Sequence, residues 1–365
     1  MNPHMPRWAD LILVPALNLL LAFLVAGLVV VFIGEDPFEA LRWLIVGALG
    51  SSYGIGFTLY YATTFVFTGL AVAIAFHAGL FNIGGEGQAA LGGIGVTLVC
   101  LAFPWPHWLL VLPFAIIGAG LFGAAWAFVP GYLQAKRGSH IVITTIMFNF
   151  IASALVVYLL VNVLKVPGAM APETRNFAPG TFLPFMHEML GVFGISMSTT
   201  PMNFSALLAL LAAFLTWVLI WRTRLGYEMR ALGHSEPAAV YGGINPVRIT
   251  VIAMVLSGAM AGMMALNVVM GFQHRLVLDY VSGAGFVGIA VSLMGRSHPV
   301  GVVLAAILFG ILYQGGAELA FEMPNISREM IVVIQALVIL FTGALENLVR
   351  VPVARLFARS GARAA

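Results

Sequence analysis

The chain of 365 residues is 61% hydrophobic and only 8% charged, whereas about a quarter of the residues in a soluble domain are charged. This composition leaves too little polar surface for a water-soluble globule and predicts a membrane protein with lipid around it. The net charge of +3 does not indicate a nucleic-acid partner, because the basic residues are not gathered on one exposed domain. The single cysteine, Cys100, excludes a disulfide framework and any multi-thiolate metal site.

The apolar residues form runs of about 20, the length that a helix needs to cross about 30 Å of hydrocarbon. The first run, Leu11 to Phe32, has no cleavage site after it, so we expect a retained helix. We predict ten membrane helices near residues 11–32, 57–78, 87–103, 108–128, 141–163, 203–221, 249–270, 284–295, 299–319 and 330–348. The eighth is short for a full crossing. The predicted fold is therefore all-α: a polytopic helical membrane protein that forms one transmembrane domain over residues 1–365.

The basic residues predict the orientation, because Lys and Arg are enriched in cytoplasmic loops. With the N-terminus inside, only five of the 17 basic residues fall outside: Arg42, Lys165, Arg175, Arg275 and Arg328. Both termini are therefore predicted to be cytoplasmic.

Two connections between the predicted helices are unusually long. The external one, about residues 166–202, contains five prolines and cannot be one regular helix. We expect it to cover the outer mouth. The internal one, about residues 222–248, is the only sizeable polar stretch on the predicted cytoplasmic face, so a soluble partner would dock there.

The internal connection carries the signals of a short helix. Ser235 is a good N-cap, Glu236 and Pro237 suit a first turn, and Gly242 is a typical stop. An ordinary connecting loop is the alternative interpretation from spacing alone.

The same stretch resembles the cytoplasmic coupling loop of ABC importer permeases, T-x-x-G-x-x-x-R-A-x-G-x-x-x-x-A-A-x-x-x-G-I. The matching residues are Thr223, Gly226, Arg230, Ala231, Gly233, Ala238, Ala239, Gly243 and Ile244. The resemblance implies that the short helix, with Glu236 in its first turn, docks in a groove of an ATPase subunit.

Two further segments resemble the permeases of this group that import nucleosides; the group also includes permeases for ribose and branched-chain amino acids. Residues Phe81 to Gln88 are similar to the motif F-N-I-G-x-E-G-Q. Residues Gly283 to Gly301 are similar to G-x-G-F-x-G-I-A-V-x-L-x-G-R-x-x-P-x-G.

These resemblances imply the membrane-spanning permease of a bacterial-type ABC importer, with a type II-like bundle in the cytoplasmic (inner) membrane. They imply three protein partners: a cytoplasmic ATPase, an extracytoplasmic substrate-binding protein, and a second homologous permease, expected to form a heterodimer with this chain. Nucleosides or related purine or sugar-like solutes would be the cargo.

The sequence offers no catalytic residues and no cofactor site. A phosphate-binding loop needs a lysine after glycine, whereas Lys136 follows Ala and Lys165 follows Leu. This chain is therefore not the ATPase, and ATP and Mg²⁺ are expected on the partner subunit.

Glycines interrupt two apolar stretches in the two halves of the chain. Gly84, Gly85 and Gly87 lie in the first, and the second contains Gly283, Gly285 and Gly288. Broken helices in corresponding halves expose backbone groups to the solute in many transporters. Close packing between helices is the alternative role of these glycines.

Polar residues inside the predicted spans are costly and indicate function or helix–helix hydrogen bonds. The candidates to line a path for a neutral hydroxyl-rich or heterocyclic solute are Asn82, Glu86, Gln88, Asn149, Asn267 and Gln314. His77 and Glu86 would be the relay groups of an ion-coupled secondary transporter, which is the alternative mechanism. An ABC permease for simple sugars or branched-chain amino acids is the alternative within the family.

Overall fold

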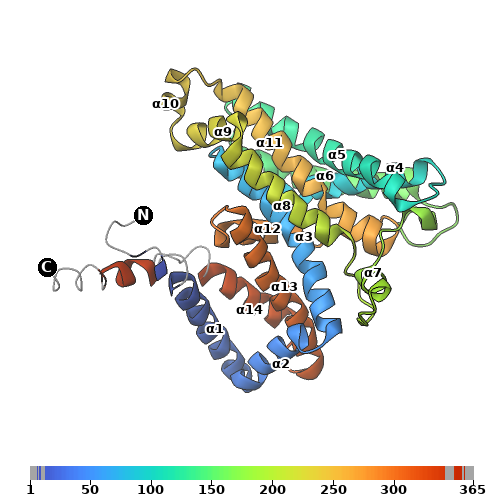
Figure 1. Ribbon diagram of the computed structural model, residues 1–365, viewed down its shortest axis with the longest axis vertical. Helices are drawn as coiled ribbons and strands as arrows, with labels where there is room; N and C mark the ends of the chain where they lie inside the picture. The colour runs from blue at the N-terminus through green and yellow to red at the C-terminus, as the bar shows by residue number, and fades with distance from the viewer. Residues whose placement is uncertain (1–5, 7, 10–12, 342–348, 356, 358–365) are drawn as a thin grey trace. The chain divides into compact units, whose positions relative to one another are not determined.

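The structure is a computed structural model that describes residues 6, 8–9, 13–341, 349–355 and 357 (Figure 1). The elements of this described part are helices, with no β-strand among them. Within the described residues, eight helices are long and apolar enough to cross a membrane: α1 (Val14–Ile33), α3 (Ser52–His77), α4 (Gly85–Ala102), α5 (Trp108–Arg137), α6 with η2 (Ile141–Leu164), α8 (Ser205–Arg222), α11 with η4 (Pro246–Gln273) and α13 (Pro299–Glu322). These helices confirm the first seven predicted spans and the ninth.

The eighth predicted span is α12 (Ala284–Met294), an apolar helix of 11 residues. At about 1.5 Å per residue it is about 16 Å long, roughly half of the hydrocarbon thickness. The tenth span begins as α14 (Arg328–Ile339). Its continuation at 342–348 lies outside the described residues, as do 10–12 at the start of the first span.

Sequence analysis did not predict α2 (Pro37–Leu49), which follows α1. This helix has a local cause, because the Asp36 carboxylate accepts a hydrogen bond of 2.8 Å from the backbone N–H of Phe38, and Pro37 is in the first turn. Its 13 residues are too few for a crossing, which is why a search for long apolar runs missed it.

The chain divides into two compact units, residues 1–54 with 311–365 and residues 55–310, called here the terminal unit and the central unit. The terminal unit contains α1, α2 and α14. Its core is a cluster of aliphatic side chains: Ala26, Val30, Ala40, Leu319, Met323, Ile326, Ile331 and Ile334. The expectation of one transmembrane domain over residues 1–365 stays a prediction.

Small residues bring α4, α5 and α11 together in the central unit. A Cβ atom on Gly258 of α11 would overlap the carbonyl oxygen of Gly123 and the Cβ atom of Ala127, both on α5. A Cβ atom on Gly92 of α4 would overlap Gly262 of α11. These glycines allow the backbones to approach closely, so packing is their role.

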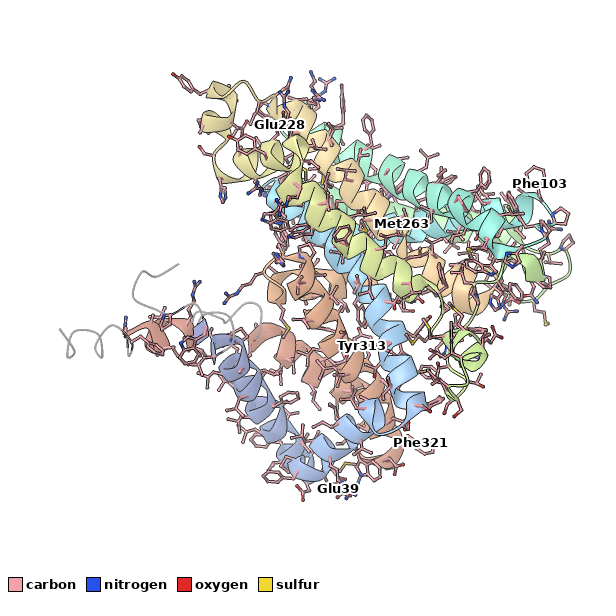
Figure 2. The ribbon with its side chains drawn as sticks, in the orientation of Figure 1. Glu39, Phe103, Glu228, Met263, Tyr313 and Phe321 are labelled. Atoms are coloured by element: carbon pink, nitrogen blue, oxygen red, sulfur yellow. The ribbon has the colours of Figure 1, made fainter. Side chains whose placement is uncertain are left out.

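The central unit has two distinct ends. At one end, α9 (Arg224–His234) and α10 (Glu236–Tyr241) follow α8; at the other, α7 (Met186–Val192) precedes it (Figure 1). Glu228 on α9 and Phe103 after α4 lie at these opposite ends, with Met263 between them (Figure 2). The sequence predicts that the α9–α10 end is cytoplasmic.

The connection between α6 and α8 contains only short elements, a 3₁₀ turn (Pro179–Thr181) and α7. Isolated backbone bridges join it to the rest of the central unit, including Glu173 to Val277. The prediction that this proline-rich stretch is not one regular helix is confirmed.

Candidate functional site

The first glycine-rich break lies between the end of α3 at His77 and the start of α4 at Gly85, and buried amide side chains satisfy its polar groups. The Asn82 amide nitrogen donates to Gln88 Oε1 (2.9 Å) and Ser257 Oγ (2.8 Å). Its Oδ1 accepts from the Gly84 backbone N–H (2.9 Å) and Gln88 Nε2 (3.1 Å). Asn82 therefore uses its full hydrogen-bonding capacity inside the protein.

Asn149 of α6 stabilises the same break from another side. Its Oδ1 accepts from the Gly87 backbone N–H (2.9 Å), and its Nδ2 donates to the Ile83 carbonyl oxygen (3.0 Å). Irregular backbone at membrane depth must find its hydrogen bonds within the protein, and these two side chains supply several of them.

Glu86 connects the first break to the second. Its Oε1 accepts from the backbone N–H of Gly283 and its Oε2 from that of Gly285, both at 2.8 Å. Gly283 is the N-cap of α12 with φ of 80°, so the carboxylate caps a helix that belongs to the other break. We call this three-residue contact the break joint.

Close contact requires Gly285 of the break joint and the nearby Gly288, whereas Gly283 is required by its positive φ. A Cβ atom on Gly285 would overlap the backbone of Glu86, and one on Gly288 would lie 2.7 Å from atoms of Thr68 in α3. Both breaks follow from the glycines in the sequence, whereas their contact does not.

A cavity of about 220 Å³ lies beside the break joint. Its polar lining comes from Glu86, Asn149, Ser153, Asp279 and Tyr280. The remaining lining includes the apolar side chains of Ala90, Val156, Val157, Leu278 and Val281. Of the six predicted path residues, only Glu86 and Asn149 line this cavity.

The cavity also contains two residues that sequence analysis missed as candidates. Ser153 is one of many small residues on a long apolar helix, so nothing marks it in the sequence. Asp279 lies four residues before Gly283, the first glycine of the second break. A carboxylate close to a glycine-rich break is the sequence signal that could have identified Asp279 as a candidate.

The other predicted path residues lie elsewhere. Asn267 donates to the Tyr60 carbonyl oxygen (3.0 Å) and Thr64 Oγ1 (2.8 Å) of α3, and its Oδ1 accepts from Asn203 Nδ2 (3.0 Å) and Ser205 Oγ (2.8 Å). These bonds join α3, η4 and the start of α8. A contact of Asn267 with the solute stays a prediction.

Gln314 belongs to the terminal unit, where its Nε2 donates to Glu318 Oε1 at 3.1 Å. In the central unit, the ring Nε2 of His77 lies 3.0 Å from the carbonyl oxygen of Ser297. A backbone carbonyl therefore satisfies this histidine.

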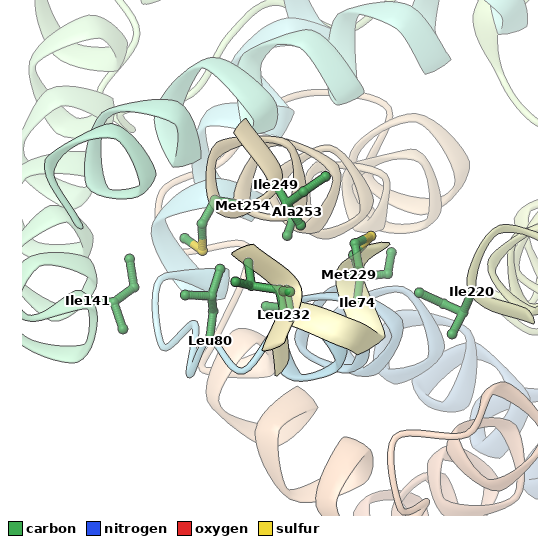
Figure 3. Packing of buried hydrophobic residues seen from close by; sticks show 12 residues of the cluster. Ile74, Leu80, Ile141, Ile220, Met229, Leu232, Ile249, Ala253 and Met254 are labelled. Carbon is green, nitrogen blue, oxygen red and sulfur yellow. The ribbon is translucent and has the colours of Figure 1, made fainter. Parts of the chain in front are cut away.

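The core of the central unit anchors α9. Met229 and Leu232 of α9 are buried in one apolar cluster (Figure 3). The cluster also contains Ile74 of α3, Leu80 of the first break and Ile249 of α11. A helix packed in this way cannot move without moving its neighbours, because protein interiors are close-packed.

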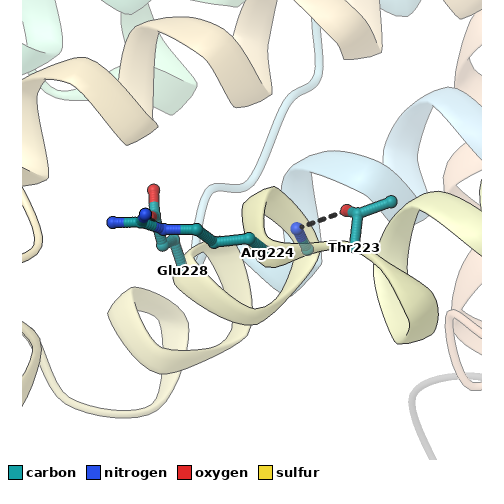
Figure 4. Close-up of polar contacts among 4 residues, drawn as sticks. Thr223, Arg224 and Glu228 are labelled. Atoms are coloured by element: carbon teal, nitrogen blue, oxygen red, sulfur yellow. Dashed lines mark hydrogen bonds and ion pairs between the residues drawn. The ribbon is translucent and has the colours of Figure 1, made fainter.

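Local sequence signals define both helices of this segment. Thr223 caps α9 by accepting from the Gly226 backbone N–H at 3.1 Å (Figure 4). Ser235 caps α10, and Gly242 follows its last residue, which confirms the predicted short helix. The ion pair of Arg224 with Glu228 (2.8 Å) is exposed and contributes little stability.

The end of α9 contacts the start of the first break directly. A Cβ atom on Gly233 would overlap the carbonyl oxygen of His77 and lie 2.9 Å from the backbone nitrogen of Gly79. Gly79 has φ of 73°, so the chain turns sharply where α9 touches it. His77 is the last residue of α3, so α9 contacts the end of that helix.

Other residues of the segment face outward. Tyr241 is 96% exposed, and Tyr227 and Val240 are also exposed. A hollow of about 370 Å³ between α9 and α10 is lined by residues that include His234, Ala238 and Gly243. Exposed aromatic and aliphatic side chains around a hollow are typical of a protein–protein interface.

The remaining residues of the predicted coupling loop divide between core and surface. Gly226 and Ala239 are buried, and Ala231 packs against the core cluster. Glu236 is exposed. Arg230 is partly buried, and its Nε has no hydrogen-bond partner among the residues that the structure describes.

Comparison with known proteins places the chain among membrane permeases. The family model described as branched-chain amino acid transport system / permease component matches residues 54–343. The chain belongs to this permease family. It is a permease subunit of the ABC-transporter type and a multi-pass protein of the inner membrane, which confirms the resemblance found in the sequence.

Three relatives cover nearly the whole permease. The guanosine ABC transporter permease protein of Bacillus subtilis is 34% identical over 91% of this chain and 93% of its own length. The glucose ABC transporter permease protein of Haloferax volcanii is 32% identical over 95% of this chain and 91% of its own length. The nucleoside ABC transporter permease protein of Lactococcus lactis is 32% identical over 90% of both.

We predict that Glu86→Gln destabilises the permease, because an amide nitrogen would face one of the two backbone N–H groups that the carboxylate now accepts. Loss of a hydrogen bond to a charged group costs about 1.5–3 kcal/mol. Thermal unfolding in detergent would measure the change. Glu188→Gln is the matched control, because Glu188 accepts one backbone N–H, from Phe185, at an exposed site. Equal effects of the two substitutions would contradict the role of the break joint.

We predict that lowering the pH destabilises the connection between α6 and α8. The His274 ring stacks on Phe182 with centroids 3.6 Å apart, and burial lowers its pKa below 6.5, although Glu188 opposes this shift. The folded state therefore favours the neutral ring, and its stabilisation is present above pH 6.5 and lost as pH falls below that value.

The Phe177 amide, which donates to the His274 carbonyl oxygen at 2.8 Å, reports this change in hydrogen exchange. Its protection factor should fall between about pH 7.5 and pH 5.5, a range that brackets the ordinary pKa of histidine. His274→Phe should keep the protection constant. A wild-type protection factor that does not change with pH would refute the prediction.

Proposed function

We propose that this permease imports nucleosides, or related purine- or sugar-containing solutes, as the translocation subunit of an ATP-driven ABC importer. The names of its relatives support this cargo, since they refer to guanosine, nucleosides and glucose. The structural observation that carries the proposal is the contact of Gly233 with His77 and Gly79. It connects the α9–α10 segment to the broken helices beside the cavity.

ATP and Mg²⁺ would bind a separate ATPase subunit that docks on α9 and α10. Three observations support this docking site: Tyr241, Val240 and Tyr227 are exposed, the two helices enclose a hollow, and the sequence of the segment resembles the coupling loop of such permeases.

A movement of α9 would reach the cavity through a short series of contacts. Gly233 contacts the chain at His77 and Gly79, the break continues to Glu86, and Glu86 binds the N-terminus of α12. Packed elements of this kind switch between discrete arrangements rather than deform continuously. ATP binding would thus change the state of the break joint through its different affinity for the two arrangements.

A second permease would complete the pathway. The polar side chains of the cavity lie beside α6, whose exposed residues include Ser153, and charged groups are not stable against lipid. A neighbouring subunit or water must therefore cover this face. Two nucleoside ABC permeases of Lactococcus lactis both match this chain, which supports a pair of different permeases. A substrate-binding protein would deliver the solute at the α7 end.

An ion-coupled mechanism has less support. Glu86 is engaged by two backbone N–H groups and His77 by a carbonyl group, so neither of the proposed relay groups is available without breaking these contacts. The alternative of an ABC permease for simple sugars is supported by the glucose relative.

Uptake of labelled guanosine into cells that contain the complete importer tests the proposal, with ribose, glucose and leucine as competitors. We expect uptake that requires an active ATPase and that unlabelled nucleosides inhibit. Inhibition by glucose or leucine alone would assign the permease to the sugar or amino acid branch of its family. Uptake that persists with an inactive ATPase would overturn the mechanism.

Tyr241→Asp in the same cells should abolish co-purification of the ATPase, because it places a charge on the exposed aromatic site. Met170→Asp is the control, since Met170 is 99% exposed and belongs to the connection between α6 and α8. Retention of the ATPase by the Tyr241 variant would show that it docks elsewhere.

A matched pair of substitutions tests the contact between α9 and the break. We predict that Gly233→Ala lowers uptake about tenfold, because overpacking at a close contact costs about 1–3 kcal/mol. Gly242→Ala should leave uptake unchanged, since its Cβ atom would lie no closer than 3.4 Å to its nearest neighbour. Co-purification of the ATPase with both variants separates coupling from docking. Normal uptake by Gly233→Ala would refute the proposed path of movement.

A further inference from the structure

We propose that the 220 Å³ cavity beside the break joint is a binding site for the hydrogen-bond donor groups of a neutral solute, such as ribose hydroxyls or a purine N–H edge. The proposal rests on the proposed function, and it adds where within this chain the solute binds and which chemistry selects it.

The cavity lies near the middle of the membrane. Ser153 is at the centre of the span Ile141–Leu164, and α12, which starts at the break joint, is only about half a membrane thickness long. Two helices thus independently give the same depth. A polar cavity at this depth is where transporters with discontinuous helices bind their solutes.

Asp279 is the residue that indicates a ligand. Its carboxylate makes no hydrogen bond or ion pair with any other residue in the described part of the chain. Its backbone has φ of 55°, which is strained for a residue other than glycine. Asp279 is exposed and lines the cavity, so its carboxylate is accessible to a ligand there.

The polar groups of the lining favour donors over acceptors. The carboxylates of Glu86 and Asp279 only accept hydrogen bonds, and the lining contains no Lys or Arg. The amide of Asn149 and the hydroxyl of Tyr280 already bind the backbone. Sugar hydroxyls and purine N–H groups therefore fit, whereas the phosphate of a nucleotide or the carboxylate of an amino acid is repelled.

The size of the cavity fits one ring system. It exceeds the cavity of about 150 Å³ that binds benzene in an engineered protein, yet it is smaller than the 300–1,000 Å³ typical of drug-sized ligands. The apolar side chains of Val156, Val157 and Val281 offer a surface for a ring face. The cavity would therefore hold the base and the sugar of a nucleoside one after the other as the solute passes.

Purified importer in proteoliposomes, with its ATPase and binding protein, tests the proposal. The measured quantity is the ratio of kcat/KM for inosine to that for 2′,3′-dideoxyinosine. Because the binding protein is the same for every permease variant, its own preference cancels when variants are compared.

We expect Asp279→Asn to reduce this ratio about tenfold, the order expected for the loss of one hydrogen bond to a charged group. Ser153→Ala should reduce it by a smaller factor. Glu322→Gln is the control, because Glu322 is exposed in the terminal unit. Size-exclusion chromatography confirms that each variant is folded. A purely structural role would lower the rates for both nucleosides equally and leave the ratio unchanged.

The outcomes separate the two proposals. ATP-dependent nucleoside uptake with the same ratio in wild type, Asp279→Asn and Ser153→Ala would overturn the binding site and leave the proposed function standing. Wild-type uptake that fails for every nucleoside would overturn the proposed function itself. Uptake that requires a sodium or proton gradient and disappears in Asp279→Asn would show that the cavity binds a cation instead.

Discussion

The hydrogen bonds from Gly283 and Gly285 to the Glu86 carboxylate are the interaction on which the central unit depends. The helices α4 and α12 begin at this contact, and the first backbone N–H groups of a helix have no partner within the helix. A carboxylate at the N-terminus of α12 satisfies two N–H groups and complements the helix dipole. One side chain thus permits both breaks, and it fixes them against each other.

Most polar side chains in the spans of this permease perform the same structural task. Asn82 and Asn149 serve the first break, and Asn267 joins three elements. Amides suit this work because they donate and accept at once without carrying charge. Asp279 differs from them, since its exposed carboxylate has no hydrogen-bond donor among the residues that the structure describes.

Close helix contact and coupling have the same origin in this fold. Glycines let α4, α5 and α11 approach until their backbones touch, and Gly233 does so between α9 and the end of α3. Such contacts transmit displacement because no flexible side chain lies between the backbones. The segment proposed to bind the ATPase therefore acts directly on the broken helices.

The sequence by itself determined the membrane class, nine of the helices at the expected places, the caps Ser235 and Gly242, and the two glycine-rich breaks. These features follow from local composition and spacing, which a linear pattern records in full. The helix α2 was not predicted, because its sequence signal is an N-cap rather than a long apolar run. Only the tertiary structure decided that the breaks meet at Glu86, that Asn82 and Asn267 are saturated, and that Ser153 and Asp279 share a cavity. The bonds of Glu86 to Gly283 and Gly285 and of Asn267 to Tyr60 join residues about two hundred positions apart. They depend on how helices pack, which no local pattern encodes.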